Sequence, residues 1–169
     1  MSHKVLLLLA LFFTPTAFAA AMDDFASGIT DALNISAKHL EIENVEGVAT
    51  YTGNVVVTLG DREMKCDKLV VYRGAESDIG RIIAYGNPVG YSGKVKDKPE
   101  IIYAYADEME YNVETQMFYM RGNARVEQGK NTYEAPEIQY DVENEIITSS
   151  PSSNGRIHMV IDAESFQGL

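Results

Sequence analysis

The sequence predicts an all-β protein, and three observations support this fold class. Apolar and polar residues alternate with a period of two in several segments, as expected for half-buried strands. Turn-forming sequences separate these segments, namely NVEG at 44–47, GDRE at 60–63, GKN at 129–131 and SSPSSNG at 149–155. One motif also occurs twice, because Gly53-Asn54 returns as Gly122-Asn123 in the second half of the chain.

The first residues predict export from the cytoplasm. Residues 1–19 contain a basic residue at Lys4, an apolar run from Val5 to Phe13, and the small-residue cleavage signal Ala17-Phe18-Ala19. This run is too short for a membrane span, which needs about 20 apolar residues. We therefore expect a cleavable signal peptide over 1–19, followed by a leader over 20–34.

The charge of the chain argues against nucleic-acid binding, and its cysteine content argues against a fold held by disulfides. The formal net charge of the chain is −11, and removal of residues 1–19, which hold Lys4 and no acidic residue, makes it −12. A nucleic-acid-binding protein needs a basic surface to displace counterions from phosphates, so we expect no nucleic-acid partner. Cys66 is the single cysteine, which rules out an internal disulfide and is interpreted as a small buried residue.

The spacing that relates Gly53 to Gly122 organises the chain. The same spacing relates the following pairs: Ala37 and Ala106, Leu40 and Met109, Glu41 and Glu110, Ile42 and Tyr111, Val57 and Val126, Gly60 and Gly129, Leu69 and Ile138, Gly86 and Gly155. Each copy is itself divided, since the small residues Ala37, Cys66, Ala106 and Ala135 are followed in turn by Gly53, Gly86, Gly122 and Gly155. We expect one domain over 35–163 and a tail over 164–169.

Alternation within the repeats places apolar side chains on one face of three strands. In chain order these inward residues are Leu40 and Ile42, then Met109, Tyr111 and Val113, then Ile138, Tyr140 and Val142. A glycine at the entrance of each strand permits a bend, and a regularly repeated bend curls a sheet. The sequence therefore predicts an open-ended, twisted β-jelly-roll built from two 69-residue repeats of antiparallel strands. Its terminal edges should stay available for pairing with neighbours.

The sequence gives no sign of catalysis. The carboxylate pairs Glu41/Glu43 and Glu108/Glu110 lie two residues apart, on the solvated face of a strand, and are interpreted as exposed charge. The histidines, Cys66 and the acidic residues show no metal-ligand spacing, and neither a nucleophile elbow nor a phosphate-binding loop occurs. We expect no enzyme activity, no metal and no cofactor.

Several segments resemble the OstA-like family. These are ISAKHLEIENVEGVATYTGNVVVTLGDREMKCDKLVVY, then IIAYGNPVGY, YADEMEY, RGNARVEQG and PEIQYDVENE. The resemblance covers about residues 33–161, and the combination of TGNVVVTLG with CDKLVVY is specific. Cys66 and Pro136 stand where the family often has alanine and aspartate, and these differences leave the strand pattern intact.

The resemblance implies a function as well as a fold. It implies a jelly roll that stacks end to end with copies of itself, with an inner-membrane-anchored jelly-roll partner and with an outer-membrane translocon. Such a bridge carries lipopolysaccharide across the periplasm in an apolar groove, by burial of the lipid A acyl chains. The resemblance places lipid contacts near Ile35, Tyr91, Tyr111 and Val113, and Met109 shares the inward phase of Tyr111.

Two of these positions need a local irregularity in the strands. Ile35 lies five residues before Leu40, so the alternation should break near Ala37. The alternation that places Val57 on the inward face would place Tyr91 one position away from that face, and a β-bulge would restore its inward orientation.

Two other interpretations remain open from the sequence. The chain could be an exported scaffold of β-repeats with a solid core and no lipid cargo. It could also have the role of the membrane-anchored partner or of the translocon domain, because both of these are jelly rolls too. The cleavable signal and the single-domain length favour the soluble bridge component.

Overall fold

The computed structural model describes residues 33–75, 79–94, 100–141, 143–144, 146–150 and 155–162. The expected signal peptide over 1–19, the leader up to residue 32, Val142 and the tail over 164–169 lie outside these described residues. The first strand begins at Leu33, two residues before the domain boundary expected at Ile35.

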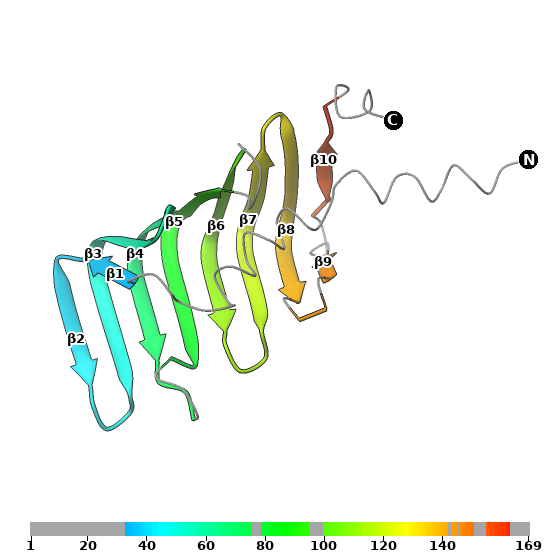
Figure 1. Cartoon of the computed structure of the whole chain (residues 1–169). Coiled ribbons are helices and arrows are strands. Elements are labelled where there is room, and N and C mark those ends of the chain that lie inside the picture. Colours follow the sequence, from blue (N-terminus) through cyan, green and yellow to red (C-terminus); the bar gives the residue numbers. More distant parts are fainter. Residues whose placement is uncertain are drawn as a thin grey trace, which may run out of the picture.

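The described chain forms one antiparallel sheet, which confirms the all-β prediction (Figure 1). Its strands are β1 (Leu33–Ser36), β2 (His39–Glu43), β3 (Val48–Leu59), β4 (Arg62–Tyr72), β5 (Arg81–Lys94), β6 (Ile101–Asn112), β7 (Met117–Gln128), β8 (Asn131–Asp141), β9 (Ile146–Ser150) and β10 (His158–Val160). Strands β3 to β8 pair in sequence order, with β1 and β2 at one edge and β9 and β10 at the other. The sheet is therefore open at both ends. In the described part of the chain, no helix is long and apolar enough to cross a membrane.

Every long strand bends at the same level across the sheet. The pairing register shifts between Thr52 and Val55, Lys65 and Lys68, Tyr85 and Val89, Tyr105 and Glu108, and Arg121 and Ala124. We call the part that carries β2, β9 and the segments 48–52, 68–72, 81–85, 108–112, 117–121 and 137–141 the first limb. The second limb carries β1, β10 and the segments 55–59, 62–65, 89–94, 101–105, 124–128 and 131–135. Buried side chains of the two limbs form one hydrophobic core.

The repeated Gly-Asn motif forms this bend. Gly53 and Gly122 have φ values of 84° and 76°, and the following Asn54 and Asn123 have φ values of 48° and 50°. Glycine and asparagine are the residues that enter this left-handed region at least cost. The prediction that glycine marks a strand entrance is wrong, because both motifs lie in the middle of a continuous strand, β3 or β7.

The sequence repeat is also a structural repeat. The register shift of β3 on β4, between Thr52 and Val55, recurs in β7 on β8 between Arg121 and Ala124. The separate strands β1 and β2 both pair with β3, as the two halves of β6 pair with β7. Likewise β9 and β10 pair with the two halves of β8, as the two halves of β5 pair with β4.

Inward side chains form rows across the strands, because residues directly opposite each other in a sheet point to the same face. Three of these rows extend from β1 or β2 to β9 or β10. Row one, on the first limb, is Leu40, Tyr51, Leu69, Ala84, Met109, Met120, Ile138 and Ser149. Row two, beside it, is Ile42, Ala49, Val71, Ile82, Tyr111, Phe118, Tyr140 and Ile147. Row three, on the second limb, is Ile35, Val57, Met64, Tyr91, Ala104, Val126, Tyr133 and Met159.

Leu40 and Ile42 point inward, as expected, but the prediction that they are buried is wrong. They belong to rows one and two, yet 52% and 57% of their surfaces are exposed. In the part of the chain that the structure describes, β2 is the edge of the first limb, so these side chains have a neighbouring strand on one side alone. The strand predicted as half-buried is therefore an exposed edge.

The outward face carries the charged residues. Arg121 donates hydrogen bonds from Nη1 to Glu108 Oε1 and to Glu110 Oε2, both at 2.6 Å, and its Nε lies 3.8 Å from Glu137 Oε2. The guanidinium also stacks over Tyr119, 4.4 Å from the ring centroid. The pair Glu108/Glu110 is thus on the outer face, as expected, but it is paired with Arg121, and Glu110 also lies 3.8 Å from Arg81 Nη1, so it is not freely exposed.

Candidate functional site

An apolar cavity lies between the two limbs at the end of the sheet that carries β1 and β2. Its volume is about 280 Å³. The lining residues are Leu33 and Ile35 from β1, Ala49, Tyr51 and Val57 from β3, Met64, Leu69 and Val71 from β4, Ile79 just before β5, and Ile82 from β5. Apart from the hydroxyl group of Tyr51, the side chains of this wall are entirely apolar.

The geometry of the bent sheet explains why the cavity forms here. Ile35, Val57 and Met64 come from row three on the second limb, and Tyr51 and Leu69 from row one on the first limb. The two walls therefore face each other across the interior. Since Leu40 and Ile42 continue rows one and two beyond Tyr51 and Ala49, the apolar surface of the first limb extends from the cavity to the open edge.

The middle of the interior is filled by the protein's own side chains. Large residues of rows one and two, such as Met120 and Tyr140, have no exposed surface. Alanines line the second limb at this level, because Ala104 and Ala106 on β6 are fully buried and Ala124 and Ala135 on β7 and β8 nearly so. Near the bend, bulky side chains of the first limb thus lie opposite a group of alanines on the second limb, which also carries larger residues such as Tyr91 and Val126.

The five predicted lipid-contact residues all lie on the inward side, but they do not share one cavity. Ile35 lines the cavity. Tyr91, Met109 and Tyr111 are 4%, 2% and 7% exposed and belong to the filled core. Val113 follows the end of β6 and packs, half-buried, against that core. The residues predicted on β6 therefore lie where side chains, and not space, occupy the interior.

Both expected irregularities are present. Strand β1 ends at Ser36 and β2 begins at His39, so the alternation breaks at Ala37. The register of β5 on β6 shifts between Tyr85 and Val89, which places Tyr91 on the inward face.

Sequence reasoning missed most of the cavity wall. Tyr51, Leu69, Val71 and Ile82 are absent from the predicted contacts, although Tyr51 and Ala49, and Leu69 and Val71, are spaced two apart. The alternation could have assigned them to an inward face. It could not have shown that they border empty space, since this depends on how the second limb folds over the first.

Two further hollows occupy equivalent positions of the two repeats. One, of about 350 Å³, is bordered by Asn54, Lys65 and Asp67, and the other, of about 590 Å³, by Asn123, Arg125, Glu134 and Pro136. Both lie at the bend and expose polar and charged groups. Their lining does not suit an acyl chain, despite their larger volumes.

Cys66 is a buried core residue, as expected. It is 6% exposed and lies where β4 bends. Burial and, to a lesser extent, the neighbouring Asp67 carboxylate raise the pKa of its thiol to about 11. The side chain therefore stays a neutral thiol at neutral pH, and such a thiol is a poor nucleophile and metal ligand. Among the described residues, no three His, Cys, Asp or Glu side chains are grouped to hold a metal ion.

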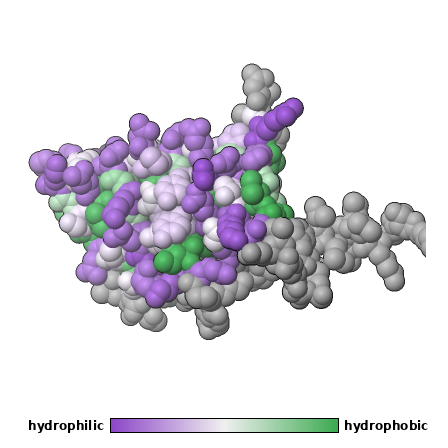
Figure 2. All heavy atoms as spheres, turned by 90° about the horizontal axis from the view of Figure 1, so that it is seen from above, coloured by the Kyte–Doolittle hydropathy of each residue, from purple (hydrophilic) through white to green (hydrophobic). Residues whose placement is uncertain are grey.

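The end of the sheet that carries β9 and β10 is built differently. Here Tyr133 of the second limb and Ser149 of the first limb share a hydrogen bond across the interior. Beyond this contact Ile157, Met159 and Val160 are 45%, 43% and 45% exposed. Figure 2, viewed from above, shows hydrophilic residues along the margins and hydrophobic patches between them, including one toward this end of the sheet.

Comparison with known proteins identifies the family. Residues 34–146 match the family model described as LptA/(LptD N-terminal domain) LPS transport protein. The chain belongs to the LptA/LptD N-terminal domain family. The matched residues include β1 and most of the strands of both limbs, so the family match and the bent sheet describe the same unit.

Individual members of the LptA/LptD N-terminal domain family are similar over most of their length. The lipopolysaccharide export system protein LptA of Escherichia coli (strain K12) is 28% identical over 152 residues, which cover 88% of this chain and 82% of that protein. The export system protein LptH of Pseudomonas aeruginosa is 26% identical over 125 residues, or 74% of this chain and 71% of LptH. The crystal structure of LptH, the LptA-homologous periplasmic component of a lipopolysaccharide transport device, superimposes with a TM-score of 0.68 at 25% identity, covering 78% of this chain and 96% of LptH.

Proposed function

We propose that this protein is a periplasmic lipopolysaccharide-binding component of a transport bridge between the inner and outer membranes. The observation that carries the proposal is the apolar cavity between the limbs, which opens onto inward rows that continue to the edge of the sheet. Membership of the LptA/LptD N-terminal domain family supplies the class of cargo. The signal peptide expected over 1–19 would deliver the chain to the periplasm.

The cavity suits an acyl chain and not a sugar or phosphate group. Its wall offers Leu33, Ile35, Val57 and similar side chains, and no charged residue. Each methylene buried in such a site contributes about 0.8 kcal/mol, so about ten methylenes contribute about 8 kcal/mol. Acyl burial can therefore hold an anionic glycolipid on an acidic protein, provided that the headgroup stays in solvent.

We call the space between rows one and two and row three the trough. Its filled middle does not prevent transport, because some of the side chains that fill it are adaptable. Met109 and Met120 lie opposite each other in row one and are buried. Methionine is unbranched and changes rotamer more easily than the other large apolar residues. We infer that these side chains rearrange, and that the alanine wall of the second limb accepts the cargo as it advances.

The edges of the sheet support stacking into a bridge. Strands β1 and β2 at one end and β9 and β10 at the other each lack a neighbour on their outer side among the described residues. Exposed apolar side chains accompany these edges, including Leu40 and Ile42 on β2, Ile146 on β9 and Met159 on β10. We infer head-to-tail pairing of copies, and pairing of terminal copies with an inner-membrane-anchored jelly roll and an outer-membrane translocon.

A second candidate function is a protein scaffold without lipid cargo. The filled middle of the interior favours it, because a scaffold needs edges and a solid core alone. The cavity at the β1 end distinguishes the two, since a scaffold gains nothing from an unfilled apolar space, which costs stability. For either role we expect a protein without catalytic activity.

A charge placed in the cavity tests the proposal. Ile35→Asp puts a carboxylate into the apolar wall, whereas Asn34→Asp puts one on the opposite face of the same strand. We expect the first change to weaken lipopolysaccharide binding at least about tenfold and the second to leave it unchanged. Binding is measured on the mature protein with fluorescent lipopolysaccharide, and circular dichroism checks the fold. Equal binding by both variants would show that the cavity is not the binding site, and no binding by the unaltered protein would favour the scaffold.

A further inference from the structure

The two repeats differ in one respect inside the trough. In the first repeat, the inward positions on β4 and β5 are Met64 and Ala84, which are apolar and cannot hydrogen-bond each other. In the second repeat, Tyr133 corresponds to Met64. Ser149 corresponds to Ala84, because Ser149 lies opposite Ile138 and Ala84 lies opposite Leu69, the repeat equivalent of Ile138. The second repeat therefore has hydroxyl-bearing residues at both positions.

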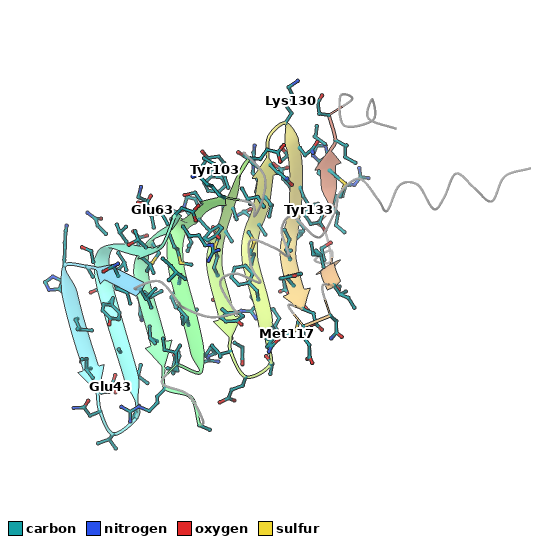
Figure 3. All side chains as sticks on the ribbon, in the orientation of Figure 1. Glu43, Glu63, Tyr103, Met117, Lys130 and Tyr133 are labelled. Atoms are coloured by element: carbon teal, nitrogen blue, oxygen red, sulfur yellow. The ribbon has the colours of Figure 1, made fainter. Side chains whose placement is uncertain are left out.

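These two hydroxyl groups meet across the interior. Tyr133, labelled on β8 in Figure 3, is 8% exposed and belongs to row three of the second limb. Its hydroxyl is hydrogen-bonded to Ser149 Oγ, at the end of row one on the first limb. The contact closes the space between the limbs at the β9 and β10 end, whereas an open cavity occupies the β1 end.

We propose that the Tyr133–Ser149 hydrogen bond is a gate that cargo must part to leave the trough at the β9 and β10 end. The inference rests on the proposed lipid-carrying function. A lipid moving along rows one and three reaches Ile138 and Val126, and must then pass between Tyr133 and Ser149 before it contacts Met159.

The surroundings of the gate allow it to open. Ser149 lies on β9, an edge strand of five residues, and within the described ranges β8 is the strand that pairs with it. The serine is half-buried, so water can replace the tyrosine hydroxyl when the limbs separate. A single neutral hydrogen bond changes an equilibrium by roughly fivefold, which is enough to bias the gate toward closure without locking it.

The test compares cargo at the two ends of the trough. A photocrosslinking residue replaces Ile35 in the cavity or Met159 beyond the gate, and the mature protein is loaded with radiolabelled lipopolysaccharide. In the otherwise native protein we expect strong labelling from position 35 and weak labelling from position 159. Tyr133→Phe should raise labelling from position 159 about fivefold and leave labelling from position 35 unchanged.

Two further variants keep the test sharp. Ser149→Ala should reproduce the effect of Tyr133→Phe, and the double variant should add nothing, because either change removes the same bond. Thr148→Ala, on the opposite face of β9, is the matched control and should change neither position. An unchanged ratio in both gate variants, with strong labelling from position 35, overturns the gate alone. Absence of labelling at both positions in every variant overturns the proposed function, and the gate with it.

Discussion

Gly53 and Gly122 hold the same left-handed backbone conformation, with φ values of 84° and 76°, at the same bend of the equivalent strands β3 and β7. The first approaches Lys38, and the second approaches Asp107 so closely that an added Cβ atom would collide with its carboxylate. The bend therefore depends on the absence of a side chain, and the facing of the two limbs depends on the bend.

Gly122→Ala should destabilise the fold by about 2 to 3 kcal/mol, because the new Cβ atom meets both an unfavourable φ and the Asp107 side chain. Gly129→Ala is the matched control. Gly129 also has a positive φ, of 59°, but no atom within 4 Å of an added Cβ, so its replacement should cost about 1 kcal/mol. Urea unfolding measures both changes. Equal losses would show that steric room at the bend is unimportant.

Arg121→Ala should lower the free energy of unfolding by about 1 to 2 kcal/mol, because it leaves Glu108 and Glu110 as neighbouring carboxylates without their shared cation. Added salt should reduce this loss by screening the repulsion. Lys65→Ala is the control. Its pair with Glu63 is more exposed, at 65% and 41% of the side chains, and should contribute less than about 0.5 kcal/mol. A loss at Lys65 as large as that at Arg121 would contradict the outer-face network.

Cys66 should make the fold sensitive to alkaline pH. Burial raises the pKa of its thiol to about 11 in the folded chain, above the value near 9 expected when unfolded. The folded state then binds the proton more tightly, so this contribution to stability is complete below about pH 9 and is lost as pH rises toward 11. Cys66→Ala should remove up to about 2 kcal/mol of this pH-dependent loss, measured by urea unfolding between pH 8 and pH 11. Parallel pH profiles for the two proteins would show that the thiol does not titrate with unfolding.

Tyr111 and Ile35 should respond differently to a charge. Tyr111 is 7% exposed and lies between Ile82 and Phe118 in row two, so Tyr111→Asp should unfold the protein. Ile35→Asp, beside the cavity and close to an edge, should leave a folded chain with a lower melting temperature. Thermal unfolding followed by circular dichroism compares them. A folded Tyr111→Asp variant would show that the middle of the trough is empty.

Edge pairing should depend on β2. Glu41→Pro removes a backbone donor from this edge strand, and Ile42→Lys adds a charge to its exposed apolar face, so both should shift the protein toward monomers. Val45→Lys is the control, because Val45 is fully exposed in the turn after β2. Light scattering after size exclusion measures the size of the assembly. An unchanged size in both β2 variants would exclude pairing through this edge.

The repeat and the alternation predicted most of the architecture. The spacing of the two Gly-Asn motifs reappears in the register shifts at Thr52 and Arg121. The inward phase assigned to Met109, Tyr111 and Ile138 is correct, because a period of two fixes the face of a strand locally.

What the sequence could not predict depends on contacts between the limbs. The sequence did not predict the cavity beside Ile35, the filled core around Tyr111 or the bond from Tyr133 to Ser149. Each of these features forms between residues of different limbs. The exposure of Leu40 was likewise missed, because no local pattern shows that a strand lies at the edge of a sheet.

The most direct test of the lipid-binding trough is native mass spectrometry of the mature protein purified from periplasmic extract without detergent. We expect a complex heavier than the chain by one lipid A-bearing molecule, which is absent from Ile35→Asp and present in Asn34→Asp. The absence of bound lipid from all three preparations would contradict a lipid-binding trough.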